Sequence, residues 1–190
     1  MKGLAFALDP DGYWIEIVSR GGDNTNVRRF SLAQTMLRVK DPLPSVEFYT
    51  KHLNMTQVNV RHFSDFSLYF LASLPESMLA KVPQDLSSPE ASSFVKETLY
   101  PNNIPVLELT HNHGTENQDS FKYDNGNTDG RRGFGHIGFL VDDLNNTCER
   151  LLNDNVEFKK KPEEGRMRNI AFALDPDGYW VELIQKGFKP

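Results

Sequence analysis

The sequence predicts an α+β fold built from paired modules, each running strand, helix and then three strands. Three observations lead to this prediction. A ten-residue segment occurs twice, at residues 5–14 and 171–180. Two similar junctions from strand to helix occur at residues 39–41 and 140–142. Several short segments alternate apolar and polar side chains, which is typical of half-buried strands. The repeat indicates that the chain contains more than one copy of a structural unit.

The later copy of the repeat lies in residues 171–184, which we predict to form a β-hairpin. Its turn is Asp-Pro-Asp-Gly at 175–178, where Pro fixes φ, Asp bonds its own backbone and Gly supplies positive φ. An alternating strand follows the turn. Glu182 shares one face of that strand with Trp180 and Ile184, so this carboxylate either reaches the rim of the sheet or is buried with a partner.

The earlier copy has almost no sequence before it. Residues 5–14 match 171–180 letter for letter, and Glu16 corresponds to Glu182. We therefore expect residues 1–22 to be the last hairpin of a preceding repeat whose earlier part is absent. The polar, glycine-containing residues 23–30 are expected to form a linker.

The first complete module is predicted at residues 31–115. Asp41, followed by Pro42, is expected to cap a helix that ends near Leu53. Residues 73–104 interrupt the pattern and read as an insertion, with its own helix over 88–100. The strands of this module are predicted at 31–39, 55–61, 66–72 and 104–112.

The second complete module is predicted at residues 131–186, after a polar loop at 113–131. Asp142 is expected to cap its helix. Its strands are predicted at 133–141 and 155–159 and in the hairpin at 171–184. Such a module buries only one face of its sheet well, so it should pair with another module.

Composition bounds the possible functions. The chain has 190 residues, 38% of them hydrophobic and 25% charged, which is ordinary for a globular protein. The net charge of −5 argues against a nucleic-acid partner. The single cysteine, Cys148, excludes an internal disulfide and a cysteine zinc site, and fits a reducing compartment such as the cytosol. We expect no membrane association and a cytoplasmic location.

Four predicted strands each present one side chain that can bind a metal among mainly apolar neighbours. Each residue alone has an ordinary structural explanation. Together they supply three oxygen ligands and one nitrogen ligand without thiolate, which suits a borderline divalent ion such as Zn²⁺, Ni²⁺, Co²⁺ or Mn²⁺. The predicted metal ligands are Gln34, Glu108, His136 and Glu182.

These residues lie in stretches that resemble a known family. The stretches are residues 34–42, 66–72, 107–112, 132–138 and 175–182. They resemble glyoxalase I, the lactoylglutathione lyases of the vicinal-oxygen-chelate superfamily. The leading hairpin resembles the end of the first half of a fungal-type enzyme with two fused repeats. The insertion resembles the longer, zinc-using class.

The resemblance implies a fold of paired βαβββ modules whose sheets curve around a metal site, with Zn²⁺ as the expected ion. It also implies a reaction, methylglyoxal detoxification with glutathione as cosubstrate. The hemithioacetal of the two compounds is isomerised to S-lactoylglutathione by proton transfer through an enediolate. Glu182 matches the family's base, and Glu108 is the second carboxylate that can move a proton. The substrate-binding residues implied by the resemblance are Arg38, Asn112, Arg132, Lys160 and Met167.

The sequence leaves the pairing of the modules open. One hypothesis joins Gln34 and Glu108 of one chain to His136 and Glu182 of a second copy, so that one chain alone is inactive. In another, Glu16 of the leading hairpin sits beside Gln34 and Glu108 in a site without histidine. In that case the partner is the missing first repeat of the parent chain. A third hypothesis pairs the two modules within one chain.

Two other functions remain as alternatives. A ring-cleaving dioxygenase of the same fold would use two histidines and one carboxylate, and Gln34 in a histidine position counts against it. A catalytically incomplete fragment would act only as a ligand-binding module and should purify without stoichiometric metal.

Overall fold

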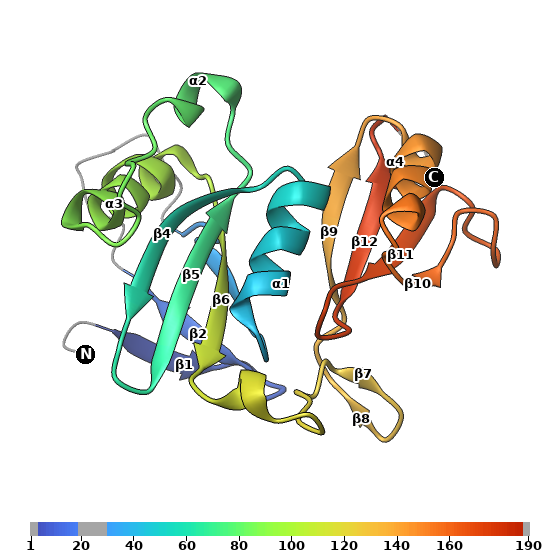
Figure 1. Cartoon of the computed structure of the whole chain (residues 1–190), viewed down its shortest axis with the longest axis horizontal. Coiled ribbons are helices and arrows are strands. Elements are labelled where there is room, and N and C mark those ends of the chain that lie inside the picture. The colour runs from blue at the N-terminus through green and yellow to red at the C-terminus, as the bar shows by residue number, and fades with distance from the viewer. Residues whose placement is uncertain (1–3, 19–29, 188–190) are drawn as a thin grey trace.

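The computed structural model describes residues 4–18 and 30–187, and within them two four-stranded sheets lie side by side with helices packed against them (Figure 1). The first sheet has the order β3-β6-β5-β4, and the second has the order β10-β11-β12-β9. The first sheet consists of β3 (Gln34–Arg38), β4 (Thr56–His62), β5 (Phe66–Ala72) and β6 (Val106–Asn112). The second consists of β9 (His136–Val141), β10 (Phe158–Lys160), β11 (Ile170–Leu174) and β12 (Trp180–Gln185).

Both sheets have the same internal arrangement. The first strand of each module pairs in parallel with the last, β3 with β6 and β9 with β12, and the other pairs are antiparallel. Residues 31–33 and 133–135 were predicted as strand but precede the observed strands. The strand pairing is the one expected for βαβββ modules, in which a helix packs on one face of the sheet and the other face is available for other contacts.

One helix follows the first strand of each module. Helix α1 (Pro42–Glu47) is capped by Asp41, whose carboxylate accepts from Leu43 N at 3.0 Å, and continues as a π-helical turn, Phe48–His52. Helix α4 (Leu144–Asn153) is capped by Asp143, not by Asp142 as predicted. The chain stays extended through Asp143, one residue further than expected. Asp142 accepts instead from Lys186 Nζ, which lies 2.8 Å from its Oδ1.

The insertion at 73–104 contains the predicted helix in three segments. A short helix α2 (Glu76–Leu79) comes first. Helix α3 (Pro89–Ser93) begins after Ser88, whose hydroxyl accepts from Ala91 N. It continues as a π-helical segment, Phe94–Leu99, and a 3-10 turn, Tyr100–Asn102. This helix packs on residues of β4, β5 and β6, where Phe94, Leu99 and Tyr100 join a second apolar cluster.

A shared core joins the two modules within the chain. From the first module it takes alternating residues such as Leu37, Leu107 and Leu109, and from the second Val181 and Leu183. All five side chains are buried. Because strand residues alternate between faces, the faces that carry Gln34, Glu108 and Glu182 point away from this shared core. The packing of the chain therefore fixes which sheet faces remain open.

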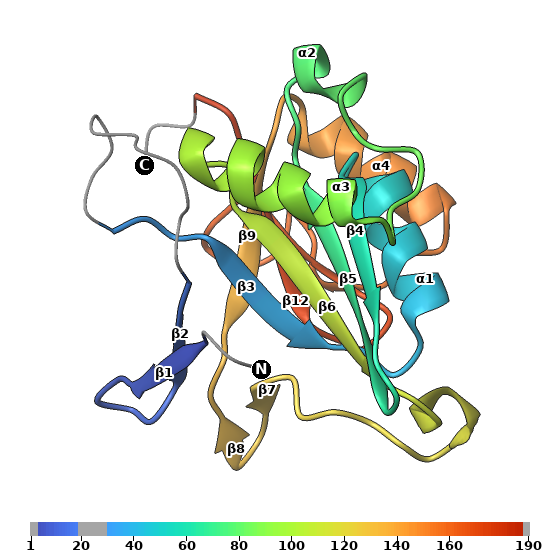
Figure 2. The ribbon, with the colours of Figure 1, turned by 90° about the vertical axis from the view of Figure 1, so that its left-hand side faces the viewer.

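The leading hairpin forms a sheet of its own. Strands β1 (Ala5–Leu8) and β2 (Trp14–Ile17) pair with each other, and Figure 2 shows them as a separate ribbon beside β3. Their apolar side chains are largely uncovered, with Trp14 74% exposed. Residues 1–3 and 19–22 of the predicted hairpin unit and 23–29 of the predicted linker lie outside the described residues.

The segment that connects the modules is more ordered than a polar loop. It contains a 3-10 turn, Thr115–Asn117, and a small hairpin of β7 (Asn127–Thr128) and β8 (Arg131–Arg132). Gly126 has φ +80°, and a Cβ there would lie 2.1 Å from the carbonyl oxygen of Phe134, so only glycine fits. Among the described residues there is no helix that is long and apolar enough to cross a membrane.

Candidate functional site

Three predicted or considered ligand side chains meet at the open face of the first sheet. Gln34 Nε2 donates to Glu16 Oε2 at 2.7 Å and to Glu108 Oε2 at 2.9 Å. Strand alternation places Gln34 on β3 and Glu108 on β6 on the same face, and the leading hairpin brings Glu16 over that face. We call these three residues the amide half-site. Glu16 therefore lies beside Gln34 and Glu108, in the arrangement without histidine that the sequence left open.

Two further side chains hold the amide half-site in place. The hydroxyl of Tyr100 donates to Gln34 Oε1 at 2.8 Å, and the hydroxyl of Thr110 donates to Glu108 Oε1 at 3.2 Å. Because carboxylates can only accept, Gln34 must turn its amino group to the two glutamates and its carbonyl to Tyr100.

Burial raises the carboxylate pKa values in this half-site. It raises the pKa of Glu108, and the nearby Glu16 carboxylate raises it further. Burial also raises the pKa of Glu16. The pKa of Tyr100 rises to about 12, from burial first and the two carboxylates second, so this hydroxyl stays protonated and able to donate. Burial and the neighbouring Glu16 carboxylate both disfavour the charged form of Glu108, and a bound cation would offset this effect.

The other two predicted ligands meet on the second sheet. His136 Nε2 lies 3.1 Å from Glu182 Oε2, with the imidazole 43% exposed and the carboxylate 17% exposed. We call this pair the imidazole half-site. Phe172, the cross-strand partner of Glu182, packs against both His136 and Trp180, since its ring centroid lies 5.3 Å from that of His136 and 5.4 Å from that of Trp180. The pair thus has an apolar floor and an open side.

The two half-sites do not meet within one chain. They belong to different sheets, and each lies on the face turned away from the shared core. Within the described residues, no group of three or more His, Cys, Asp or Glu side chains is placed to hold a metal ion. The donor types of the predicted set suit a borderline divalent ion, but one chain does not bring all four donors together. A complete metal site therefore does not fit the single chain.

The predicted substrate-binding residues are spread over several elements. Arg38 is exposed on the open face of β3, in the same alternation as Gln34. Asn112 ends β6 and donates to the hydroxyl of Tyr123 at 2.9 Å. Arg132 lies on β8 and not on a strand continuous with His136, because the chain leaves strand conformation at Gly133–Gly135. Strand alternation therefore does not relate the side chain of Arg132 to that of His136, and the role of Arg132 in binding stays a prediction.

The remaining two lie at the loop between β10 and β11. Lys160 ends β10 and donates to backbone carbonyls of that loop. Met167 is 62% exposed on the loop itself. Their contacts with substrate also stay predictions.

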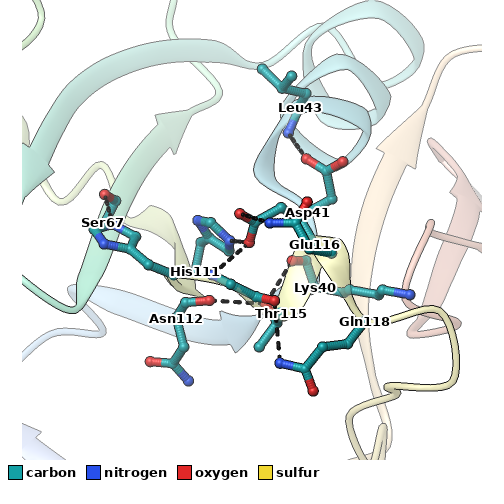
Figure 3. A network of polar contacts seen from close by, with 12 residues as sticks. Lys40, Asp41, Leu43, Ser67, His111, Asn112, Thr115, Glu116 and Gln118 are labelled. Carbon is teal, nitrogen blue, oxygen red and sulfur yellow. Dashed lines mark hydrogen bonds and ion pairs between the residues drawn. The ribbon is translucent and has the colours of Figure 1, made fainter.

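The histidines near Glu108 have structural partners. His111 points to the opposite face of β6, where its Nε2 lies 2.8 Å from Glu116 Oε2 (Figure 3). The hydroxyl of Thr115, in the same network, donates to the carbonyl oxygens of Lys40 and Asn112. These contacts tie the start of the connector to the end of β3 and explain His111 without a ligand.

A cavity of about 950 Å³ lies away from both half-sites. It is bordered by α1, the connector and the turn of the second hairpin, with Lys40, Phe121 and Asp177 among its lining residues. None of the four predicted ligands lines it.

Two residues of the site were not predicted from the sequence. Tyr100 comes from the insertion, and no sequence pattern relates the position of the insertion to β3. Phe172 lies in the apolar run of the repeat, where nothing distinguishes it from core residues. The register opposite Glu182 would have pointed to Phe172, because cross-strand pairs share a face.

Residues 31–183 match the family model of the Glyoxalase/Bleomycin resistance protein/Dioxygenase superfamily. Among curated proteins, the chain is 41% identical over 190 residues to "Lactoylglutathione lyase" of Schizosaccharomyces pombe, covering 98% of this chain and 56% of that protein. It is 45% identical over 180 residues to "Glyoxalase I" of Saccharomyces cerevisiae, covering 94% and 50%. The chain thus spans about half the length of these two relatives.

A bacterial relative is covered almost completely. The chain is 47% identical over 160 residues to "Lactoylglutathione lyase" of Pseudomonas putida, covering 83% of this chain and 86% of that protein. Among solved structures, glyoxalase I of Leishmania major has a TM-score of 0.55 at 28% identity, covering 84% of this chain and 88% of that one. Glyoxalase I of Zea mays has a TM-score of 0.57 at 26% identity, covering 84% and 46%.

Proposed function

Since the chain belongs to the glyoxalase superfamily, and within it to the glyoxalase I family, we propose that it is a lactoylglutathione lyase whose active site is shared between two copies. The amide half-site of one copy joins the imidazole half-site of the other. The substrate is the hemithioacetal of glutathione and methylglyoxal, and the product is S-lactoylglutathione. The proposed setting is methylglyoxal detoxification in the cytoplasm.

The observation that carries this proposal is the separation of the two half-sites within one chain. Each half-site has part of the donor set and lies on an open sheet face, so the set becomes complete only when two such faces meet. The match covers 86% of the Pseudomonas putida relative, so a protein named "Lactoylglutathione lyase" has about the length of these two modules. This similarity in length supports the proposal that a chain with two modules is long enough to be the enzyme's subunit. A second copy is then the simplest source of the missing half.

The leading hairpin occupies the place that the second copy must take. In our proposal the leading hairpin is displaced, and β11 and β12 of the second copy bring Glu182 to the position that Glu16 occupies in the single chain. The apolar side chains of β1 and β2 are largely exposed, which suits this exchange. The hairpin is held to the first module by the bond from Gln34 to Glu16 and by Val18, which packs against the second apolar cluster.

The residues then have distinct roles. Glu182 lies beside an apolar floor of Phe172 and Trp180, which limits water around the carboxylate that removes the proton from the carbon bearing sulfur. Glu108, held by Thr110, is the carboxylate available for the second proton transfer. Arg38 on the open face of β3 is placed to attract a carboxylate of glutathione.

The completed set would hold a divalent metal through Gln34, Glu108, His136 and Glu182. Zn²⁺ fits these donors, and Ni²⁺, Co²⁺ and Mn²⁺ are alternatives. When bound, such an ion supplies positive charge that stabilises an enediolate.

The test is formation of lactoylglutathione across a protein dilution series with Zn²⁺ present, with molar mass measured on the same samples. We expect activity to follow the dimer fraction. Activity from a monomer would refute the shared site. A folded, metal-bound dimer without activity would refute the lyase assignment and leave a ligand-binding module.

A matched pair of variants tests which hairpin supplies the base. Glu182→Gln is expected to lower activity by about 10²–10⁴-fold, the usual contribution of a general base. Glu16→Gln, at the corresponding position of the leading hairpin, is expected to keep activity because Glu182 of the second copy replaces it. The opposite result would place the working site in the Glu16 arrangement.

A further inference from the structure

The loop between β10 and β11 is held by one side chain. Lys160 Nζ donates to the carbonyl oxygens of Lys161 at 3.2 Å, Met167 at 2.6 Å and Ile170 at 2.8 Å. These acceptors lie at the start, near the end and just beyond loop residues 161–169. One ammonium group therefore joins both ends of the loop.

The chemistry of lysine makes this contact complete. An ammonium group has three donors and no acceptor, and here each donor has a carbonyl partner. Hydrogen bonds from a charged donor are stronger than those between neutral groups. Among the described contacts, two further hydrogen bonds lie inside the loop: Lys161 N donates to Glu164 Oε2 at 2.8 Å, and Glu164 N donates to the carbonyl oxygen of Lys161 at 3.1 Å. These two bonds close a small turn and do not reach the second half of the loop.

The backbone of the loop fits around the lysine side chain. Gly165 has φ +68°, and a Cβ there would lie 3.6 Å from Lys160 Cε. The loop thus bends over the aliphatic part of Lys160 and also accepts from its head group.

The register places Lys160 near the imidazole half-site. Lys160 pairs with Phe172 across β10 and β11, and Phe172 pairs with Glu182 across β11 and β12. Two strand spacings separate Lys160 from Glu182 in the sheet, or about 10 Å. The loop that Lys160 holds therefore starts within reach of a ligand bound at Glu182.

We propose that Lys160 is a positioning residue that fastens loop 161–169 beside the imidazole half-site. Its relevance to catalysis rests on the proposed function, whereas the fastening itself does not. A carboxylate of the substrate can bind Lys160 only by displacing one of the three carbonyls, because the ammonium has no fourth donor. Lys160 thus sets the shape of the loop before it can touch any ligand.

The experiment is limited trypsin digestion of the chain without metal or substrate, following cleavage after Arg166 and Arg168. Lys160→Met keeps the aliphatic part and removes the three donors. We expect cleavage in the loop to be about ten times faster, because cleavage follows the population of the open loop. Lys160→Arg is expected to restore most of the protection, since its guanidinium can again donate to the carbonyls.

Lys159→Met is the matched control. Lys159 is the preceding residue, and its Nζ lies 5.6 Å from the centroid of the Trp180 ring, in a contact separate from the loop carbonyls. We expect its loop cleavage to equal that of the unmodified chain. Thermal unfolding and cleavage outside the loop, measured for all variants, separate a local effect from loss of folding. Equal loop cleavage in Lys160→Met and Lys159→Met, or no rescue by Lys160→Arg, would overturn the proposal whatever the outcome of the lyase assay.

Discussion

The same ten residues form a hairpin at both ends of the chain, in contrasting surroundings. The leading copy pairs Phe6 with Glu16, and the later copy pairs Phe172 with Glu182 in the same register. In the later copy Ala171, Ala173 and Val181 are fully buried, whereas in the leading copy the corresponding residues are exposed.

The shared part of the two hairpins is encoded locally. Asp9 Oδ1 accepts from Asp11 N and Tyr13 N, both at 2.9 Å. Asp175 Oδ1 accepts from Asp177 N at 3.0 Å and from Tyr179 N at 2.8 Å. The turn therefore forms from its own residues, with or without a core beneath it.

The second oxygen of the turn aspartate shows what the core adds. Asp175 Oδ2 accepts from the buried hydroxyl of Tyr49 at 2.8 Å. Asp177 accepts from Lys40 N at 2.9 Å, which links the second hairpin to the first module. The comparison indicates that conformation is set within the hairpin and stability is set by what covers it.

The largest expected difference is in packing. Leu183→Ala removes a fully buried side chain from the shared core, so we expect a loss of about 2–5 kcal/mol in the free energy of unfolding. Ile17 corresponds to Leu183 but is 52% exposed, so Ile17→Ala should cost less than about 1 kcal/mol. Urea unfolding of both variants measures the difference. Equal losses would mean that the leading hairpin is as well covered as the later one.

The next difference is in pH dependence. Burial raises the pKa of Asp175 to about 6 from an ordinary value of 3.8, so the folded state binds more protons than the unfolded state between these values. The stability that this proton provides is present below pH 3.8 and is lost as the pH rises through about 6, by roughly 3 kcal/mol. Asp175→Asn should remove this slope, because the amide stays neutral and its oxygen still accepts from the turn.

Asp9→Asn is the control for this measurement. Among the described contacts, Asp9 accepts hydrogen bonds from Asp11 N, Gly12 N and Tyr13 N, all within its own turn. Unfolding followed by circular dichroism from pH 4 to 7 gives the slope for each variant. A slope unchanged in Asp175→Asn would show that another group carries the pH dependence.

The smallest expected difference concerns the second aspartate of each turn. Asp177→Ala leaves Lys40 N without its acceptor and should cost about 1–3 kcal/mol. Asp11 is exposed in the leading hairpin, so Asp11→Ala should stay within about 0.5 kcal/mol. Denaturant midpoints of the two variants provide the check, and a larger loss for Asp11→Ala would reverse the comparison.

Much of this arrangement follows from the sequence. Alternation within single strands places Gln34 and Arg38 on one face and Leu37 on the other, and both placements match the burial. The repeated decapeptide predicts the hairpin, because its turn contacts lie within a few residues. The four predicted ligands therefore emerged from local patterns and from the family resemblance.

The pairing of the half-sites depends on contacts that local patterns do not encode. Packing of Leu107 and Leu109 against Val181 and Leu183 turns the ligand-bearing faces away from each other, and alternation alone allows the opposite arrangement. The strand predicted at 133–141 begins at His136, and the preceding Gly133 and Gly135 lie outside it. Tyr100 reaches Gln34 from an insertion whose position relative to β3 is set only by tertiary packing.

The most direct test of a site shared between two copies is complementation between two inactive variants. Glu108→Gln disables the amide half-site and Glu182→Gln disables the imidazole half-site, so each variant alone should be inactive. Mixed after dissociation and reassociation, they should form mixed dimers with one intact site and recover about a quarter of the activity of the unmodified chain. No recovery in samples shown by mass to contain the mixed dimer would contradict the shared site.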